Sequence, residues 1–294
     1  MQNKYFDELL AAFPEVQRDR HGLTFSQSAG AARAARTLSE AGVVMLREAL
    51  PADALPSCHQ SFERFTRSLP REAESGSWHS PWLVHDDAMC PAAVILTNLL
   101  RSWAWNVVEE LCGSTEIAVL LAFCVARHAI DMRLGAGAHQ DAKGLPAELP
   151  FSLWVPLHAV TPLRNSGLGF LPPSPHQLLP ALPNNDVGSE YVLDHFAEGW
   201  VPSYAAGDLT IHSSLLPHFT TGYGTGSDRF SLEVRAMAAR DADPKLQDPA
   251  IYVARRHGQP AIVGAQCSPG IPADRFLAEL SGVFSGDRGF AARS

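Results

Sequence analysis

The sequence is poor in cysteine, with five among 294 residues and no CxxC pair. The five are scattered, and an odd number of scattered cysteines favours neither a disulfide framework nor a structural zinc site. They are Cys58, Cys90, Cys112, Cys124 and Cys267. We expect reduced thiols, several of them buried.

The chain also lacks a surplus of basic residues, because its formal net charge is -8. An acidic protein has no general attraction for phosphate backbones, so nucleic acid is not an expected partner. Residues 1–20 carry acids and contain neither a basic start nor a long apolar run. We therefore expect neither a secretory signal nor a transmembrane segment, and we expect a cytoplasmic location. A lipid-linked substrate at a membrane surface would still be accessible to such a protein.

The composition is ordinary for a globular protein, at 46% hydrophobic and 18% charged residues. Helical spacing of apolar residues dominates the chain before about residue 115. The expected helices are 4–13, 26–41, 52–68 and 98–112, and the apolar run 42–46 indicates a strand between the second and third. The sequence does not determine the oligomeric state.

After residue 115 the pattern changes to short strand-like runs separated by proline and glycine. These runs are 117–127, 151–157, 169–171, 208–212 and 230–237. They predict a mostly β fold with flanking helices, whose core is a jelly roll, or double-stranded β-helix.

We expect one domain over 1–294. Residues 1–114 would form a mainly helical N-terminal part with the first strand. Residues 115–240 would form the jelly-roll core, with an insertion or lid over 180–207. Residues 241–294 would be a C-terminal extension with a short helix over 272–284.

The chemistry is concentrated in the triplet His139-Gln140-Asp141. In a strand, residues i and i+2 point the same way, so His139 and Asp141 can reach one metal while Gln140 turns aside. Two imidazoles and one carboxylate on one face of an octahedral ion are the ligand set of non-heme Fe(II) oxygenases. A second histidine is therefore needed from elsewhere in the chain.

A second triplet of the same form is His85-Asp86-Asp87. It lies among the helical segments, and no His-then-Arg pair follows it at strand spacing. We interpret it as a solvated loop or substrate-facing rim and keep it as the rival metal site. Among the twelve histidines of the chain, an HxD triplet alone is weakly specific.

The second half of the pattern begins with Gly207-Asp208, continues through a strand-like run to His218, and ends at Arg229. Together with the HxD triplet, Trp154-Val155-Pro156-Leu157, Asn165-Ser166-Gly167-Leu168 and Pro172-Pro173-Ser174-Pro175-His176, this order resembles the phytanoyl-CoA dioxygenase family of Fe(II)/2-oxoglutarate oxygenases. The resemblance covers roughly residues 38–240.

The resemblance implies that His139, Asp141 and His218 bind Fe(II), and that 2-oxoglutarate and O2 are cosubstrates. It also implies that Arg229 pairs with the distal carboxylate of 2-oxoglutarate, helped by the Thr220 hydroxyl, and that Trp154 lies close to the cosubstrate. His212 is the competing ligand, but the spacing to Arg229 favours His218.

Two departures from the family pattern are visible. The usual PGSH turn is PPSPH here, and an asparagine usual between the last histidine and the arginine is replaced by the glycine-rich run 221–226. Asp141 is intact, and family relatives that halogenate lack this acid. Hydroxylation of a small-molecule metabolite is therefore the expected reaction.

The substrate is not fixed by the motif. Arg127, Arg133 and Lys143 favour an anionic or sugar-acid-like molecule, such as the octulosonic acid of lipopolysaccharide, while natural-product and acyl substrates remain alternatives. Arg127 would then bind substrate or cosubstrate, although an arginine at a strand end is commonly structural. The alternative function is a zinc or manganese hydrolase or isomerase of cupin type, or an inactive metal-binding relative.

Overall fold

The computed structural model describes residues 2–20, 22–69, 76–78, 84–85, 88–129, 137–142, 150–173, 177–180, 182, 186–222, 229–242 and 250–266. Its α-helices are α1 (Gln2–Ala12), α2 (Ala31–Ala41), α3 (Leu55–Ser68), α4 (Ala92–Leu100), α5 (Trp103–Cys112) and α6 (Ser189–Phe196). Short 3-10 turns cover Pro14–Gln17, Gln27–Ala29 and Ala239–Asp241.

The strands of the N-terminal part are β1 (Thr24–Phe25), β2 (Val43–Leu46), β3 (Gly76–Trp78), β4 (Val84–His85) and β5 (Ala88–Met89). Those that follow are β6 (Ile117–Ala129), β7 (Phe151–Pro156), β8 (Gly167–Phe170), β9 (Leu209–Ser213), β10 (His218–Thr221), β11 (Arg229–Ala238), β12 (Ala250–Arg256) and β13 (Gln259–Gln266).

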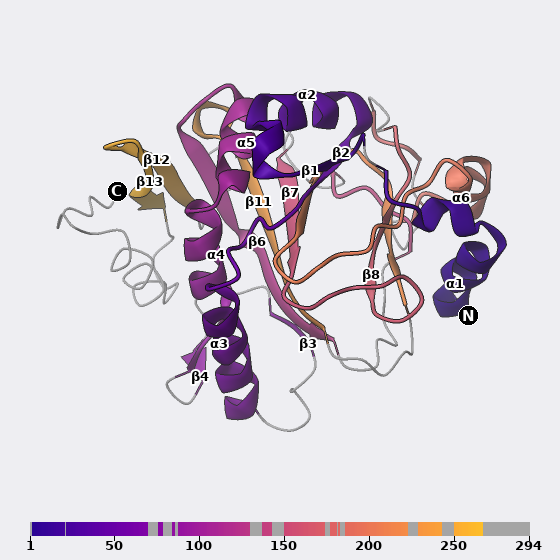
Figure 1. Cartoon of the computed structure of the whole chain (residues 1–294), viewed down its shortest axis with the longest axis horizontal. Helices are drawn as coiled ribbons and strands as arrows, with labels where there is room; N and C mark the ends of the chain where they lie inside the picture. Colours follow the sequence, from indigo (N-terminus) through magenta and orange to yellow (C-terminus); the bar gives the residue numbers. More distant parts are fainter. Residues whose placement is uncertain are drawn as a thin grey trace.

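Two sheets face each other and build a jelly-roll core, as the strand pattern predicted. The large sheet has the order β1-β2-β9-β7-β11-β6-β12-β13, with β3 also paired to β6, and the small sheet pairs β10 with β8. All pairings except β1 with β2 are antiparallel. Figure 1 shows helices α2 to α5 covering one side of the large sheet, with β8 and then α1 and α6 on the other side.

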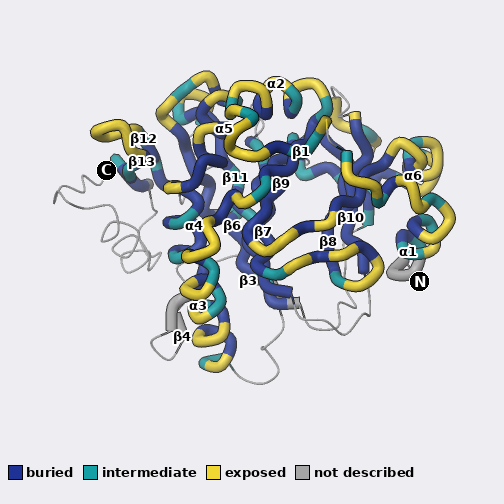
Figure 2. Tube along the Cα trace, in the orientation of Figure 1, coloured by how far each residue is buried: buried dark blue, intermediate teal, exposed yellow. Residues whose placement is uncertain are grey.

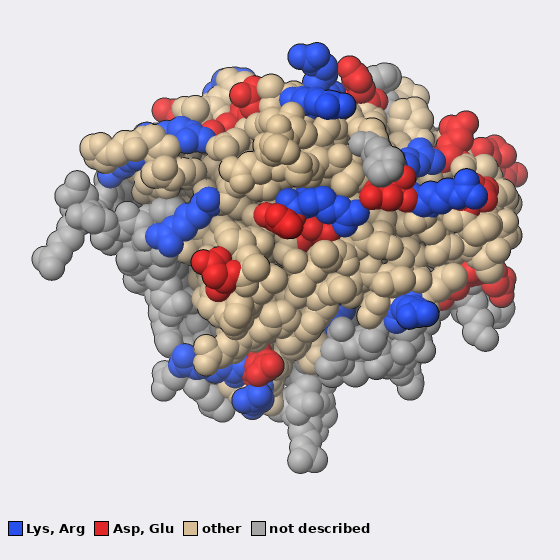
Figure 3. Space-filling model, viewed as in Figure 1, with Lys and Arg blue, Asp and Glu red and all other residues tan. Residues whose placement is uncertain are grey.

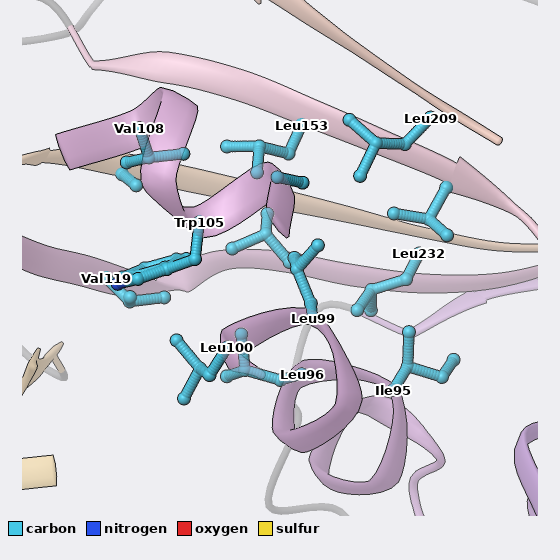
Figure 4. Close-up of a cluster of buried hydrophobic side chains, with 14 of the residues drawn as sticks. Ile95, Leu96, Leu99, Leu100, Trp105, Val108, Val119, Leu153, Leu209 and Leu232 are labelled. Carbon is cyan, nitrogen blue, oxygen red and sulfur yellow. The ribbon is translucent and has the colours of Figure 1, made fainter. Parts of the chain in front are cut away.

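The main hydrophobic core lies between the large sheet and helices α2 to α5. Leu96 and Leu99 of α4 and Trp105 of α5 belong to one buried cluster with Leu153 and Leu232 of the sheet (Figure 4). The sheet strands are buried along most of their length, whereas the outer surfaces of α2 and α3 are exposed (Figure 2). Packing of the helices against one face of the large sheet holds its strands in place and leaves the other face toward the small sheet.

Strand β11 presents chemically different side chains to its two faces. Phe230, Leu232, Val234 and Ala236 belong to the helix-side core. Because side chains alternate along a strand, Arg229, Ser231, Glu233 and Arg235 point toward the small sheet. The space between the two sheets therefore receives polar groups from the large one.

The Gly207-Asp208 pair is a structural turn before β9. Gly207 has φ +88°, and a Cβ there would come within 2.8 Å of the Leu50 carbonyl oxygen, so the turn requires glycine. The Asp208 carboxylate is buried and accepts hydrogen bonds from the Arg47 guanidinium and from the backbone N–H groups of Glu48 and Ala205. This part of the motif positions β9 rather than taking part in chemistry.

Several expected elements differ in detail. The helix expected over 98–112 is two helices, because Ser102 is extended (φ -85°, ψ 161°) and interrupts it between α4 and α5. The helix expected over 26–41 begins only at Ala31, after Gly30 adopts φ +86°. The hairpin of β12 and β13 was not expected, and it extends the large sheet beyond β6.

Other expectations are untested. The tail helix over 272–284 lies outside the described residues. The division into an N-terminal part, a core with its 180–207 insertion and a C-terminal extension stays a prediction, although α6 places a helix inside the insertion.

Acidic and basic side chains are interspersed on the face shown in Figure 3. Within the described part of the chain, no helix has the length and apolar character that crossing a membrane requires.

Candidate metal centre

The backbones of His139 and His218 form one rung at the edge of the small sheet. The N–H of each residue donates to the carbonyl of the other, at 3.0 Å in both directions. Residues paired in this way project their side chains to the same face of a sheet. The two imidazole rings accordingly lie side by side, with centroids 4.3 Å apart.

The Asp141 carboxylate is the third member of the group. Its Oδ1 lies 3.7 Å from His139 Nε2 and 3.8 Å from His218 Nε2. Potential ligand atoms of the three residues all lie within 4.8 Å of one another, and among the described residues this is the one such group that could hold a metal ion. The two halves of the sequence pattern therefore meet in space.

Hydrogen bonds on the far side of each ring fix which nitrogen faces Asp141. His139 Nδ1 lies 2.8 Å from the Gly137 carbonyl oxygen, and His218 Nδ1 lies 3.1 Å from the Leu216 carbonyl oxygen. A carbonyl can only accept, so each Nδ1 carries the proton and donates it. The Nε2 lone pairs are then available to a metal, which is the usual arrangement around metal-binding histidines.

The charges in the group suit a divalent cation. Burial, reinforced by the neighbouring His139, holds the pKa of His218 well below its usual range, so this ring stays neutral. Burial alone would raise the pKa of Asp141, but the surrounding groups, among them the positively charged Arg235, outweigh burial and hold this pKa well below the ordinary value. An ionised Asp141 carboxylate and a neutral His218 imidazole are protonation states that metal binding needs.

A polar rung of the large sheet lies behind Asp141. His212 of β9, Ser152 of β7 and Arg235 of β11 are neighbours in register. The Ser152 hydroxyl donates to Asp141 Oδ2 at 2.8 Å, and Arg235 Nη2 forms an ion pair with Oδ1 at 2.8 Å. Each carboxylate oxygen thus has its own partner on the large sheet.

His212 approaches the site without joining it. Its Nε2 lies 3.8 Å from Asp141 Oδ2, too far for a hydrogen bond, and its ring centroid is 4.6 Å from that of His218. It is not a member of the potential ligand group. His218, not His212, lies in that group, and the role of His218 as a ligand stays a prediction.

Arg229 lies at the start of β11 and is buried, with 1% of its surface exposed. Its Nη1 donates to the Ser166 hydroxyl at 2.6 Å, and its guanidinium carbon lies 5.4 Å from the ring centroid of Trp154. Trp154 follows Ser152 by two positions on β7, so both point into the same space between the sheets. Burial of a guanidinium beside an aromatic ring is typical of an anion-binding position.

The remaining predicted residues are placed as follows. Thr220 is buried on β10, two positions after His218 and on the same face. Arg127 is partly exposed on β6, opposite Ser231, and so shares the Arg229 face of the sheet. Arg133 and Lys143, together with the side chains of the 85–87 triplet, lie outside what the structure describes.

Three residues of this site escaped the sequence analysis as functional candidates. Ser152 and Arg235 lie in strands that were interpreted as core, and Ser166 was noted only as part of a turn motif. A signal was present for Arg235, since a charged residue at even spacing from Arg229 in an apolar strand must share its face.

Comparison with solved structures identifies this architecture as the jelly-roll fold of Fe/2-oxoglutarate-dependent oxygenases. EctD from S. alaskensis, solved with 2-oxoglutarate and 5-hydroxyectoine, is similar with a TM-score of 0.57 and 16% identity, covering 76% of this chain and 83% of its own. The epimerase SnoN, in complex with Fe3+, α-ketoglutarate and nogalamycin RO, gives a TM-score of 0.56 and 18% identity over 72% of this chain and 85% of its own. The non-heme monooxygenase ThoJ gives a TM-score of 0.55 and 18% identity, covering 85% of this chain and 94% of its own.

At these identities the likeness establishes the fold. No protein-family model and no curated protein sequence matches the chain.

Proposed function

We propose that this protein is an Fe(II)- and 2-oxoglutarate-dependent dioxygenase that hydroxylates a small-molecule metabolite. The observation that carries the proposal is the meeting of His139, Asp141 and His218 on one face of the jelly roll, with Arg229 buried on the facing sheet. The fold shared with EctD and SnoN, whose structures contain 2-oxoglutarate or α-ketoglutarate, supports it.

In this proposal His139 Nε2, His218 Nε2 and Asp141 Oδ1 would hold the iron. Three protein ligands would leave room at such an ion for cosubstrate and O2. Bound there, iron and 2-oxoglutarate would supply the oxidising chemistry, in which one atom of O2 enters the substrate, the other enters the carboxylate of succinate, and CO2 is released.

The protein's own residues orient the reactants. Arg229 would bind the distal carboxylate of 2-oxoglutarate through two parallel hydrogen bonds, with Ser166 holding the guanidinium and Trp154 packing against it. The Thr220 hydroxyl would help bind that carboxylate, and Arg127 would meet an anionic group of the substrate. The buried walls around Phe170 and Trp200 would exclude water.

The alternative is a zinc or manganese enzyme without oxidative chemistry. A buried arginine that faces the same space between the sheets has no role in simple hydrolysis, and therefore favours the oxygenase. The decisive measurement is anaerobic addition of Fe(II) and 2-oxoglutarate, with a weak visible charge-transfer band expected. Absence of the band, with tight retention of zinc, would establish the alternative.

Turnover is tested by succinate release against a panel of anionic, sugar-acid, acyl and natural-product candidates. Succinate reports turnover whatever molecule is oxidised. Asp141→Ala is the matched control, and it should abolish succinate formation while leaving the fold intact by circular dichroism.

A further inference from the structure

The two sheets divide the contacts of Asp141 between them. The imidazoles of His139 and His218 approach Oδ1 from the small sheet, while Arg235 and Ser152 approach the carboxylate from the large sheet. Two donors of the large sheet therefore bind the Asp141 carboxylate, while its Oδ1 also faces the two imidazoles.

The contacts of Arg235 fix its guanidinium in place. Its Nη2 is 2.8 Å from Asp141 Oδ1 and 3.2 Å from Glu233 Oε1, and its guanidinium carbon lies 4.9 Å from the ring centroid of Phe123. The side chains of Arg235 and Asp141 are 12% and 6% exposed, so water screens their interaction poorly.

A purely structural ion pair would not need this arrangement. Arg235 already has Glu233 on its own strand as a partner, yet its shorter contact reaches across to the carboxylate oxygen that faces both imidazoles. Ser152, the in-register neighbour of Arg235 on β7, holds the other oxygen. Arg235 and Ser152, which are paired across β11 and β7, therefore both bind the Asp141 carboxylate.

We propose that Arg235 and Ser152 are positioning residues that orient Asp141 for metal binding, and this inference rests on the proposed function. Ser152 fixes the rotation of the carboxylate through Oδ2, and Arg235 occupies one acceptor position of Oδ1 and leaves the other for the metal. Outer partners of this kind orient ligands and tune metal affinity, and their loss typically lowers affinity about 10- to 100-fold.

The test measures Co(II) binding to the full chain by its visible d–d absorption, without cosubstrate or turnover. We expect Arg235→Met to raise the Co(II) dissociation constant about 10- to 100-fold and Ser152→Ala to raise it less. Arg235→Lys should recover part of the affinity, since it keeps the charge but loses the planar geometry. The matched control is Arg255→Met, which removes an arginine that pairs with the Glu109 carboxylate far from the site, and it should leave Co(II) affinity unchanged.

The outcomes separate the two proposals. A wild-type protein without a Co(II) site contradicts the proposed function itself. A wild-type site with unchanged affinity in Arg235→Met and Ser152→Ala overturns the positioning role alone, and tighter binding in Arg235→Met would mean that the guanidinium competes with the metal for Oδ1.

Thermal unfolding without metal identifies variants that fail to fold. If Arg235→Met does so, Ser152→Ala and Arg235→Lys carry the test. In the folded variants, weaker Co(II) binding together with an unchanged KM for 2-oxoglutarate would place the effect at Asp141 rather than at Arg229.

Discussion

The backbone of His139 pairs with the backbone of His218 through two hydrogen bonds of 3.0 Å, although the two residues lie far apart in the sequence. The proposed iron site is therefore assembled by the pairing of the 137–142 segment with β10. Because the pairing sets the positions of both imidazoles, geometry at the metal depends on the edge of the small sheet.

The first prediction concerns Arg229 and the cosubstrate. Loss of a buried charge partner costs about 2 kcal/mol or more, so Arg229→Gln should raise the KM for 2-oxoglutarate at least about thirtyfold. Arg229→Lys should be intermediate, because an ammonium cannot make the paired contact. Succinate release at varied 2-oxoglutarate concentrations measures the KM of both variants. An unchanged KM in Arg229→Gln would contradict the proposed role of Arg229 in binding the distal carboxylate.

The second prediction concerns two hydroxyl groups of the proposed 2-oxoglutarate site, those of Ser166 and Thr220. Ser166→Ala removes the acceptor of the 2.6 Å bond from Arg229, and Thr220→Val removes a buried hydroxyl on the His218 strand. Each loss should cost about 0.5–1.5 kcal/mol, or roughly 2- to 12-fold in the KM for 2-oxoglutarate. Co(II) affinity should stay the same in both variants, and a fall in it would show that they disturb the metal ligands instead.

The third prediction separates the two histidines of the β9–β10 region. His218→Gln should abolish stoichiometric Co(II) binding, whereas His212→Gln should keep a one-to-one site, because His212 lies outside the ligand group. Titration of Co(II) absorbance makes the comparison. If His212→Gln lost the Co(II) site and His218→Gln kept it, His212 rather than His218 would be the second imidazole ligand.

The fourth prediction follows from the buried thiols. Burial raises the pKa of Cys58 and of Cys112 to about 11 and that of Cys90 to about 12. Because these pKa values rise on folding, the thiols contribute stability that is fully present below the unfolded pKa near 9 and is lost as pH rises through about 11.

The native protein at pH 8 should therefore react slowly with a thiol reagent at Cys58, Cys90 and Cys112, and all three should label quickly in denaturant. Peptide mass mapping measures the labelling of each. The free energy of unfolding should also fall between pH 9 and 11, and rapid native labelling of Cys90 would contradict the burial on which both expectations rest.

The sequence predicted the jelly roll, and the structural comparisons confirm it. It could do so because short strand-like runs separated by proline and glycine, with no helix-length segments between them, are typical of antiparallel β folds. The order of motifs also located the residues that the structure brings together at His139, Asp141 and His218. Their roles as ligands stay a proposal.

Other features depended on contacts that no periodicity reveals. The break between α4 and α5 is set by the extended backbone of Ser102 inside a continuous apolar pattern. The β12–β13 hairpin turns through His257 and Gly258, both with positive φ, and this two-residue turn was its overlooked signal. The shared contacts of Arg235 and Ser152 with Asp141 depend on the register of β7 against β11, which no sequence pattern indicates.

The two-faced character of β11 limits how this strand can change. Insertion or deletion of one residue between Arg229 and Arg235 would place the two arginines on opposite faces of the strand, so that one of them would enter the apolar helix side and apolar neighbours would face the proposed site. Packing and chemistry would then fail in a single event. Along this strand, natural variation and laboratory redesign are therefore confined to replacing side chains at constant length.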